Sequence, residues 1–201
     1  MEKKVIPEEW GHPIIVRGEV EVRKIGGKKV VFPIRSFSRW AHRALMNYVL
    51  PNYASGITKA PITFTHLPIS NLNGESKGWY EAESNPPVSC DHFCGKLRVG
   101  ASDTAWAYDQ YNLQDPKDEA SAYSRRLDTT EEDSTIKAEF QGLIQATGTY
   151  DIKETGLIGV FYPTTGSADY YLVSRDVLPA PIPVQPFDVV VVYYRFTVGG
   201  G

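Results

Sequence analysis

The last segment with strand character, residues 188–198, carries apolar side chains on both of its faces. It reads Asp-Val-Val-Val-Val-Tyr-Tyr-Arg-Phe-Thr-Val. Because successive side chains of a β-strand point to opposite sides, such a run needs apolar cover above and below the sheet. The sequence therefore predicts either a strand at the centre of a β-sandwich or a strand that packs against another subunit.

Proline, glycine and tyrosine are plentiful in the chain, with 14, 17 and 12 copies among 201 residues. Together with β-branched residues they favour strands and turns over helices. A chain of this length fits one domain and can bury a core without disulfides or metal. We predict a mainly β protein: an antiparallel β-sandwich with one amphipathic helix packed on it and long loops.

A β-hairpin is predicted at residues 14–34, where Gly26-Gly27 supply the positive φ of a tight turn between two apolar arms. In this hairpin we expect Glu19, Glu21 and Arg23 to face water.

The amphipathic helix is predicted at about 37–50. Ser36 or Ser38 would cap its first turn and Pro51 would stop it. The apolar residues recur at helical spacing and form one continuous stripe: Phe37, Trp40, Ala41, Ala44, Leu45, Tyr48 and Val49.

The remaining chain divides into an arm, a domain and a tail. Residues 1–13 indicate an N-terminal arm, residues 14–198 a single β-sandwich domain, and residues 199–201 a flexible tail. Two long loops are expected, at about 70–95, which is rich in Asn, Gly, Ser and Pro, and at about 101–133, which is polar and acidic without a lasting period. Further strands are predicted at 61–69, 96–99, 134–142, 145–152, 157–162 and 170–174, and the prolines of 179–186 predict an extended segment.

Charge and hydropathy point away from nucleic acid and membrane. The net charge is −3, so no global positive field attracts a polyanion. No stretch approaches the roughly 18 continuous apolar residues of a membrane span, and the first residues lack the apolar region of a secretory signal. We expect a protein made in a cytoplasm, with no direct nucleic-acid partner, no membrane and no cofactor.

Cys90, His92 and Cys94 form the sharpest local pattern, because thiolates and imidazole suit zinc. On a strand the two cysteines would lie about 13 Å apart, and on a helix His92 would point elsewhere. Only a bent loop would join all three, with a fourth ligand from elsewhere. We therefore favour buried or idle thiols and keep these residues as weak metal candidates.

No common catalytic motif occurs in the sequence. There is no His-Glu-x-x-His, Gly-x-Ser-x-Gly or Gly-x-x-x-x-Gly-Lys pattern. A dispersed triad or a glycosidase carboxylate pair stays open, since such groups need not be close in sequence. We expect a protein without enzymatic activity.

Aromatic residues in the arm and in the predicted loops are candidates for a binding surface. With Asp and Asn nearby they could stack on sugars, but Trp and Tyr are also favoured at protein interfaces. We favour the protein interface, and add two prolines of the extended segment. The interface candidates are Trp10, Trp79, Tyr80, Trp106, Tyr108, Tyr111, Pro181 and Pro183.

The order of several motifs resembles structural proteins of tailed-phage particles, of the tail-collar, neck, baseplate and fibre-adaptor kind. The similar segments are Gly18-Glu-Val-Glu-Val-Arg, Leu97-Arg-Val-Gly-Ala-Ser-Asp-Thr-Ala, Thr149-Tyr-Asp-Ile-Lys-Glu-Thr-Gly-Leu-Ile-Gly, Tyr171-Leu-Val-Ser-Arg-Asp-Val-Leu-Pro and the closing strand. The looser step from Asp109 to Pro116 also fits. Ala101 and Ser102 replace the Gly-Thr of the family pattern, and residues 70–95 have no counterpart in it.

Glu154 lies beside Gly156, where we expect a bend as the strand ends. There its carboxylate would satisfy backbone donors or pair with Arg175, as a structural rather than a catalytic pair.

The resemblance implies a structural component of a tailed-virus particle (tail, neck, collar, baseplate or capsid surface) that acts through protein–protein assembly. The expected partners are copies of the chain in a symmetric homo-oligomer and other virion proteins, and the expected location is the virion. One alternative is a host-receptor or carbohydrate-binding module that uses Trp79, Trp106 and Tyr108. A second alternative is a virion-associated hydrolase.

Overall fold

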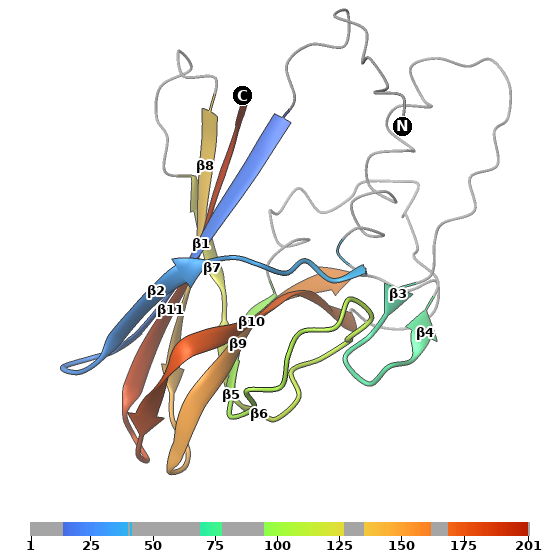
Figure 1. Cartoon of the computed structure of the whole chain (residues 1–201). Coiled ribbons are helices and arrows are strands. Elements are labelled where there is room, and N and C mark those ends of the chain that lie inside the picture. The colour runs from blue at the N-terminus through green and yellow to red at the C-terminus, as the bar shows by residue number, and fades with distance from the viewer. Residues whose placement is uncertain are drawn as a thin grey trace, which may run out of the picture.

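A computed structural model describes residues 14–39, 41, 69–77, 95–126, 135–161 and 169–200 of the chain. These residues form eleven strands that pair antiparallel in three sheets (Figure 1). The five-stranded sheet has the order β2-β1-β11-β8-β7, the four-stranded sheet β10-β9-β5-β6, and the smallest sheet pairs β3 with β4. The strands are β1 (Ile14–Lys24), β2 (Lys29–Pro33), β3 (Ile69–Ser70), β4 (Ser76–Lys77), β5 (Lys96–Gly100), β6 (Pro116–Ser121), β7 (Tyr123–Arg126), β8 (Thr135–Gln145), β9 (Tyr150–Phe161), β10 (Asp169–Val184) and β11 (Val189–Gly200).

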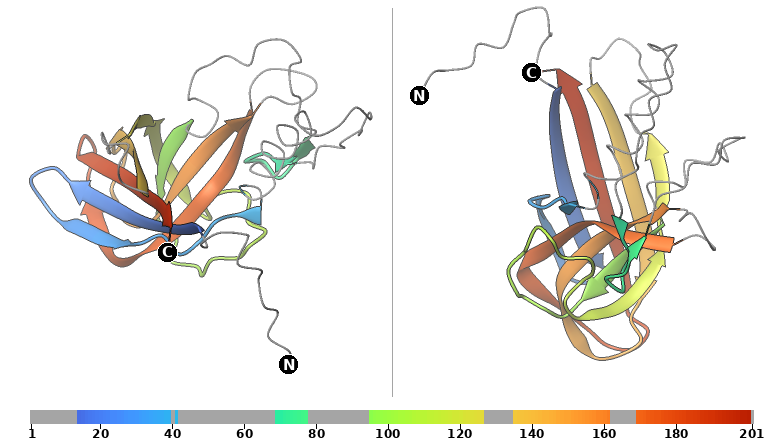
Figure 2. Two further views of the ribbon diagram at one scale, coloured as in Figure 1. Left: turned by 90° about the horizontal axis from the view of Figure 1, so that it is seen from above. Right: turned by 90° about the vertical axis from the view of Figure 1, so that its right-hand side faces the viewer.

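The apolar closing segment is β11, and it lies at the centre of the five-stranded sheet between β1 and β8. Val190, Val192 and Tyr194 are buried toward the core, and Val191 is buried on the other face. Of the two sequence alternatives, the central strand is therefore what the structure shows. Figure 2 shows the ends of β1, β8 and β11 extending past the four-stranded sheet on the side where the C-terminus lies.

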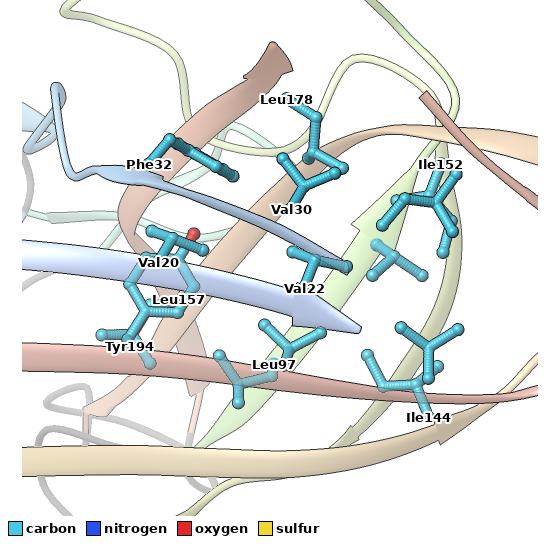
Figure 3. Packing of buried hydrophobic residues seen from close by; sticks show 14 of the residues in the cluster. Val20, Val22, Val30, Phe32, Leu97, Ile144, Ile152, Leu157, Leu178 and Tyr194 are labelled. Atoms are coloured by element: carbon cyan, nitrogen blue, oxygen red, sulfur yellow. The ribbon is translucent and has the colours of Figure 1, made fainter. Parts of the chain in front are cut away.

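The two larger sheets face each other across one hydrophobic core (Figure 3). Ala122 separates β6, which pairs with β5, from β7, which pairs with β8, so one run of chain passes from one sheet to the other. Such a crossing strand is how packed sheets make a corner. The buried core residues are Val20, Val22, Val30, Phe32, Leu97, Val99, Ile144, Ala146, Ile152, Leu157, Tyr171, Val173, Leu178, Ile182, Val184, Val190, Val192 and Tyr194.

Residues 34–38, which follow β2, run along the outer edge of β10. Ser38 donates its amide to Val173 O at 2.9 Å and its hydroxyl to Leu172 O. Ser174 donates its hydroxyl to Ser36 O at 2.5 Å. We call residues 34–38 together with residues 172–176 of β10 the seam. These bonds cover part of an edge strand that would otherwise present unpaired backbone groups.

The predicted hairpin is confirmed as β1 and β2, with Gly26 at φ 71° in the turn. The expectation that Glu21 faces water is wrong, because the residue is only 5% exposed. Its carboxylate oxygen Oε2 forms ion pairs with Arg195 Nη1 at 2.9 Å and with Lys29 Nζ at 3.3 Å. Burial by itself would raise the pKa of Glu21, but the hydrogen bonds and charges of those two side chains outweigh it and lower the pKa.

Most of the predicted helix at about 37–50 lies outside the described residues. Within them, Ser38 Oγ accepts a hydrogen bond from the Ala41 amide at 3.0 Å, the contact that an N-cap residue makes. Ser36 instead donates its hydroxyl to Arg175 O in the seam.

The two predicted loops contain more pairing than expected. Strands β6 and β7 lie within the predicted loop at 101–133, so that assignment is wrong for residues 116–126. The only buried residue of β6 is the polar Asp118, so the strand lacks the apolar alternation that sequence reasoning needs. Backbone pairing with β5 forms it nonetheless. Strands β3 and β4 form a short hairpin across residues 69–77, where a loop from 70 onward was expected.

Strand β9 continues through Gly156, so the prediction that one strand ends in a bend there and another begins at 157 is wrong. Gly156 pairs with Arg98 on one side and Arg175 on the other. A Cβ atom there would lie 2.4 Å from Leu113 Cδ1, so the glycine makes room for a side chain instead of bending the strand. The predicted strand at 170–174 continues as β10 into the proline segment, with a register shift between Val177 and Ile182.

Candidate functional site

The loop at residues 101–115 lies on the outward face of the four-stranded sheet, between β5 and β6 (Figure 1). Its Leu113 is buried against Ile158 of β9 and Leu172 of β10. The partly buried side chains around these three residues are Leu72, Trp106 and Tyr170. This small cluster is separate from the main core and holds the loop to the sheet through apolar contact.

Arg175 and Glu154 form a fully buried ion pair beneath this loop. Arg175 Nε lies 2.5 Å from Glu154 Oε2, and both side chains are 0% exposed. The register explains the contact: Arg175 pairs directly with Gly156, and Glu154 is the next residue on the same face of β9. The structure thus brings together the two residues that the sequence analysis paired.

The remaining polar atoms of the pair bind the loop. The arginine donates to Gln110 Oε1 at 3.1 Å and to Thr104 O at 2.9 Å. The glutamate accepts the amides of Asp115 at 2.8 Å and Gln114 at 3.2 Å. A buried ion pair is tolerated when further hydrogen bonds satisfy its polar atoms, as they do here. The pair therefore fixes the loop at its beginning, middle and end.

Arg98 of β5 holds the same loop from the side. It donates to Asn112 Oδ1 at 2.8 Å and to Glu119 Oε2 at 2.9 Å, and Asn112 donates to Leu72 O at 3.1 Å. Burial alone would raise the pKa of Glu119, but its bonds with Lys96 and Arg98 outweigh burial and lower it. The loop is thereby joined to β5, β6 and the residues beside β3.

On this fixed loop, Trp106 is half-buried, whereas Tyr108 and Tyr111 are 56% and 46% exposed. Arg39 donates its amide to Tyr108 O at 3.1 Å, and a Cβ atom at Gly74 would lie 3.2 Å from the Tyr111 ring. We call Tyr108 and Tyr111 the aromatic surface. Exposed tyrosines on a constrained backbone can stack on an apolar partner and offer a hydroxyl for hydrogen bonding.

The remaining interface and metal candidates from the sequence lie away from the loop at 101–115 or outside the described residues. Pro181 and Pro183 are exposed near the end of β10, where their carbonyl groups accept bonds from Lys28 at 2.9 Å and Lys24 at 3.4 Å. These prolines contact the β1–β2 hairpin and not the loop at 101–115. The candidates that lie outside the described residues are Trp10, Trp79, Tyr80, Cys90, His92 and Cys94.

A shallow open depression is lined by Lys24, Tyr150, Asp151 and Pro183, among others. Burial raises the pKa of Tyr150 far above its ordinary value, and the hydrogen bond of its hydroxyl to Asp118 raises it further.

Over the part of the chain that the structure describes, no group of three or more His, Cys, Asp or Glu side chains is placed to hold a metal ion. In the same ranges, no helix is both long and apolar enough to cross a membrane.

Sequence reasoning missed the partners that fix the loop. Gln110, Asn112 and the carbonyl of Thr104 carried no signal, because a polar loop residue gives no sign of which distant strand it meets. Arg98 lies on a predicted strand between apolar residues, which indicates an outward position, but not its partner.

Replacing Gly100 with Ala is expected to loosen the loop and to cost about 1–3 kcal/mol of folding free energy. The new Cβ atom would lie 2.5 Å from Glu154 Oε1 and 2.6 Å from Asp115 O. Glu154 Oε1 accepts the Asp115 amide at 2.8 Å and Asp115 O accepts the Ala101 amide at 3.0 Å, so moving either oxygen disturbs a hydrogen bond. Urea denaturation measures the loss. Gly148→Ala is the matched control, since its Cβ atom would meet nothing closer than Tyr150 at 3.9 Å. Equal stability of the two variants would contradict a rigid loop anchor.

Comparison with known proteins finds no matching protein-family model, curated protein or solved structure.

Proposed function

We propose that this chain is a non-enzymatic structural component of a tailed-virus particle and acts through protein–protein contact. The observation that carries the proposal is the aromatic surface, two exposed tyrosines on a loop held by a buried ion pair. The loop is ordered before any partner arrives, so binding loses little conformational entropy. Tyrosines that are held in place in this way are typical anchors of protein interfaces.

The resemblance to tailed-phage proteins supports the virion setting. Its strongest match is residues 149–159, which belong to β9 from residue 150 onward, and residues 171–179, which follow it in the pattern, belong to β10. These segments supply Glu154 and Arg175, the residues that fix the loop. The shared motif thus has a physical purpose in this chain: it holds a contact loop on the outward face of a sheet.

The proposed partners are copies of the chain in a symmetric homo-oligomer and neighbouring virion proteins. The proposed architecture is a β-sandwich on which the helix predicted at about 37–50 is packed. The closing strand has its backbone paired by β1 and β8, its inner face covered by the core, and Val191 of its outer face buried within the chain. The contact role therefore rests on the loop.

The double variant Tyr108→Ser/Tyr111→Ser is expected to weaken self-association at least about tenfold, since removing two interface anchors costs more than about 1.4 kcal/mol. Sedimentation velocity over a concentration series measures the association, and thermal unfolding should be unchanged. Tyr123→Ser is the matched control, because Tyr123 is a 70% exposed tyrosine on β7, away from the loop. A wild-type chain that stays monomeric at every concentration, or a control that weakens association equally, would contradict the proposal.

The same aromatic surface also suits the alternative of carbohydrate binding, because Tyr108 and Tyr111 flank Asp109 and Gln110. Glycan-array binding that is lost in the double variant, without any change in self-association, would favour that alternative. A polysaccharide or peptidoglycan digestion assay with purified protein tests the hydrolase alternative.

A further inference from the structure

A group of buried polar side chains lies where the seam meets the core, apart from the loop and its ion pair. It consists of Ser36, Ser174 and Asp176 with Tyr194 of β11, and all four are buried. Asp176 Oδ1 accepts the Arg35 amide at 2.9 Å, and Asp176 Oδ2 lies 2.6 Å from Ser174 Oγ. The side chain of Asp176 therefore joins the segment after β2 to the edge of β10.

The hydrogen atoms of the two serines are already in use. Each hydroxyl carries one hydrogen, and a carbonyl oxygen only accepts. Ser36 donates its hydrogen to Arg175 O, and Ser174 donates its hydrogen to Ser36 O at 2.5 Å. Ser174 Oγ thus lies at hydrogen-bond distance from two oxygens, Ser36 O at 2.5 Å and Asp176 Oδ2 at 2.6 Å, with one hydrogen for both. The Ser36 carbonyl can only accept, so a second hydrogen, carried by the aspartate, is what allows both close contacts to be hydrogen bonds.

No cation compensates a charge at this position. In the described part of the chain Asp176 has no ion-pair partner: the Arg35 side chain is exposed and contributes its backbone amide, and Arg175 points to the opposite face toward Glu154. From β11, the Tyr194 hydroxyl lies 3.4 Å from Asp176 Oδ2, a long contact, and it also bonds to the uncharged Thr155 of β9. Burial raises the pKa of Tyr194 well above its ordinary value, so this hydroxyl keeps its proton.

We propose that Asp176 is a neutral carboxylic acid in the folded protein and that its proton closes the seam. The acid donates from Oδ2 to Ser174 Oγ, and Ser174 in turn donates to Ser36 O. Burial raises the pKa of Asp176, and the bonds from Arg35, Ser174, Ser36 and Tyr194 only partly offset it. Loss of the proton forces Ser174 to turn its hydrogen toward the carboxylate, which leaves the buried Ser36 carbonyl without that donor.

The seam is therefore a pH-sensitive part of the fold. The pKa of Asp176 in the folded chain lies above the ordinary 3.8, so the folded state holds a proton that the unfolded state has lost. The stabilisation is fully present below pH 3.8 and is lost as the pH rises through the folded pKa. At pH values above the folded pKa of Asp176, the segment at 34–38 should be the first part of the sheet edge to open.

The variant Asp176→Asn tests the proposal, because an amide has the shape and the hydrogen-bonding groups of the neutral acid. Its Nδ2 can donate to Ser174 and its Oδ1 can accept from Arg35. Urea denaturation from about pH 4 to about pH 8 should show the variant gaining stability relative to the wild type as the pH rises. Within the window between the two pKa values, the ratio of the unfolding constants changes by up to about tenfold per pH unit.

Asp118→Asn is the matched control with the opposite sign. Burial alone would raise the pKa of Asp118, but bonds from Tyr150 and Thr147 outweigh it and lower the pKa. That variant should therefore lose stability relative to the wild type as the pH rises toward 3.8, and the difference should stay constant above that pH. For this pair the urea series is extended below pH 3.8.

A second measurement does not depend on the variant's stability. The ¹³C chemical shift of the Asp176 carboxyl carbon should stay that of a protonated acid at pH values where the exposed aspartates are ionised. If Asp176→Asn does not fold, the deuterium isotope effect on the carboxyl ¹³C shifts of the wild-type protein still shows whether Asp176 carries a proton. The proposal would be overturned if the Asp176 carboxyl ionised at the same pH as the exposed aspartates. It would also be overturned if Asp176→Asn were less stable than the wild type by an amount that is constant or grows as the pH rises.

Discussion

Replacing Arg175 with Met is expected to destabilise the protein by about 3–5 kcal/mol, the usual cost of removing one partner of a buried ion pair. Glu154 would stay buried without its cation, and Gln110 and Thr104 would each lose a hydrogen bond. Urea denaturation at neutral pH measures the loss. Amide hydrogen exchange at residues 104–115 should rise with it, because the arginine holds that loop.

Arg23→Met is the control for the Arg175 variant. It makes the same substitution on β1, where Arg23 is about half-exposed and lies 3.9 Å from Glu21. A pair of this kind contributes about 0–1 kcal/mol. If Arg175→Met were as stable as the control, the buried pair would not be what fixes the loop. The aromatic surface would then lose its physical basis as a preformed contact site.

Replacing Leu97 with Ala is expected to cost about 2–5 kcal/mol, because a buried leucine leaves a cavity when it is truncated. Leu97 is fully buried on β5 and faces the opposite sheet (Figure 3). There its side chain lies against Gly142 of β8: a Cβ atom added to that glycine would lie 3.1 Å from Leu97 Cδ1. A glycine has no side chain that could move into the space. Thermal and urea unfolding would both report the loss.

Leu143→Ala is the control for the Leu97 variant, since Leu143 is next to Gly142 on β8 but is 52% exposed on the outward face. A surface substitution of this kind changes stability by about 0.5 kcal/mol or less. A small effect at Leu97, comparable to the control, would mean that the two sheets do not share a tightly packed core.

Local patterns predicted the elements whose side chains alternate clearly. The hairpin of β1 and β2 follows from two apolar arms around Gly26, and the central place of β11 is one of the two alternatives that its two apolar faces predicted. The pairing of Glu154 with Arg175 was expected as a structural contact, and the structure forms it with the backbone donors of Asp115 and Gln114 as well. In each case the chemistry of a few neighbouring residues leaves few alternatives.

Local patterns failed where a polar residue occupies the buried position. Strand β6 buries Asp118, which is held by Thr147 and Tyr150 from a distant part of the chain. The strand end expected at Gly156 does not occur: β9 continues through it, and Leu113 from the loop fills the space above the glycine. Neither fact is visible before the partner segment is known.

The sequence by itself determined that this chain is mainly β, that its closing segment is apolar on both faces, and where its first hairpin turns. Only the tertiary structure decided which loop residues bind the pair of Arg175 and Glu154, and that Asp176 and Ser174 meet in the seam. The physical reason is the distance along the sequence over which each effect acts. Alternation and turn chemistry act between neighbours in the chain, whereas the hydrogen-bond partner of a buried polar group is fixed by strand register between residues far apart in sequence.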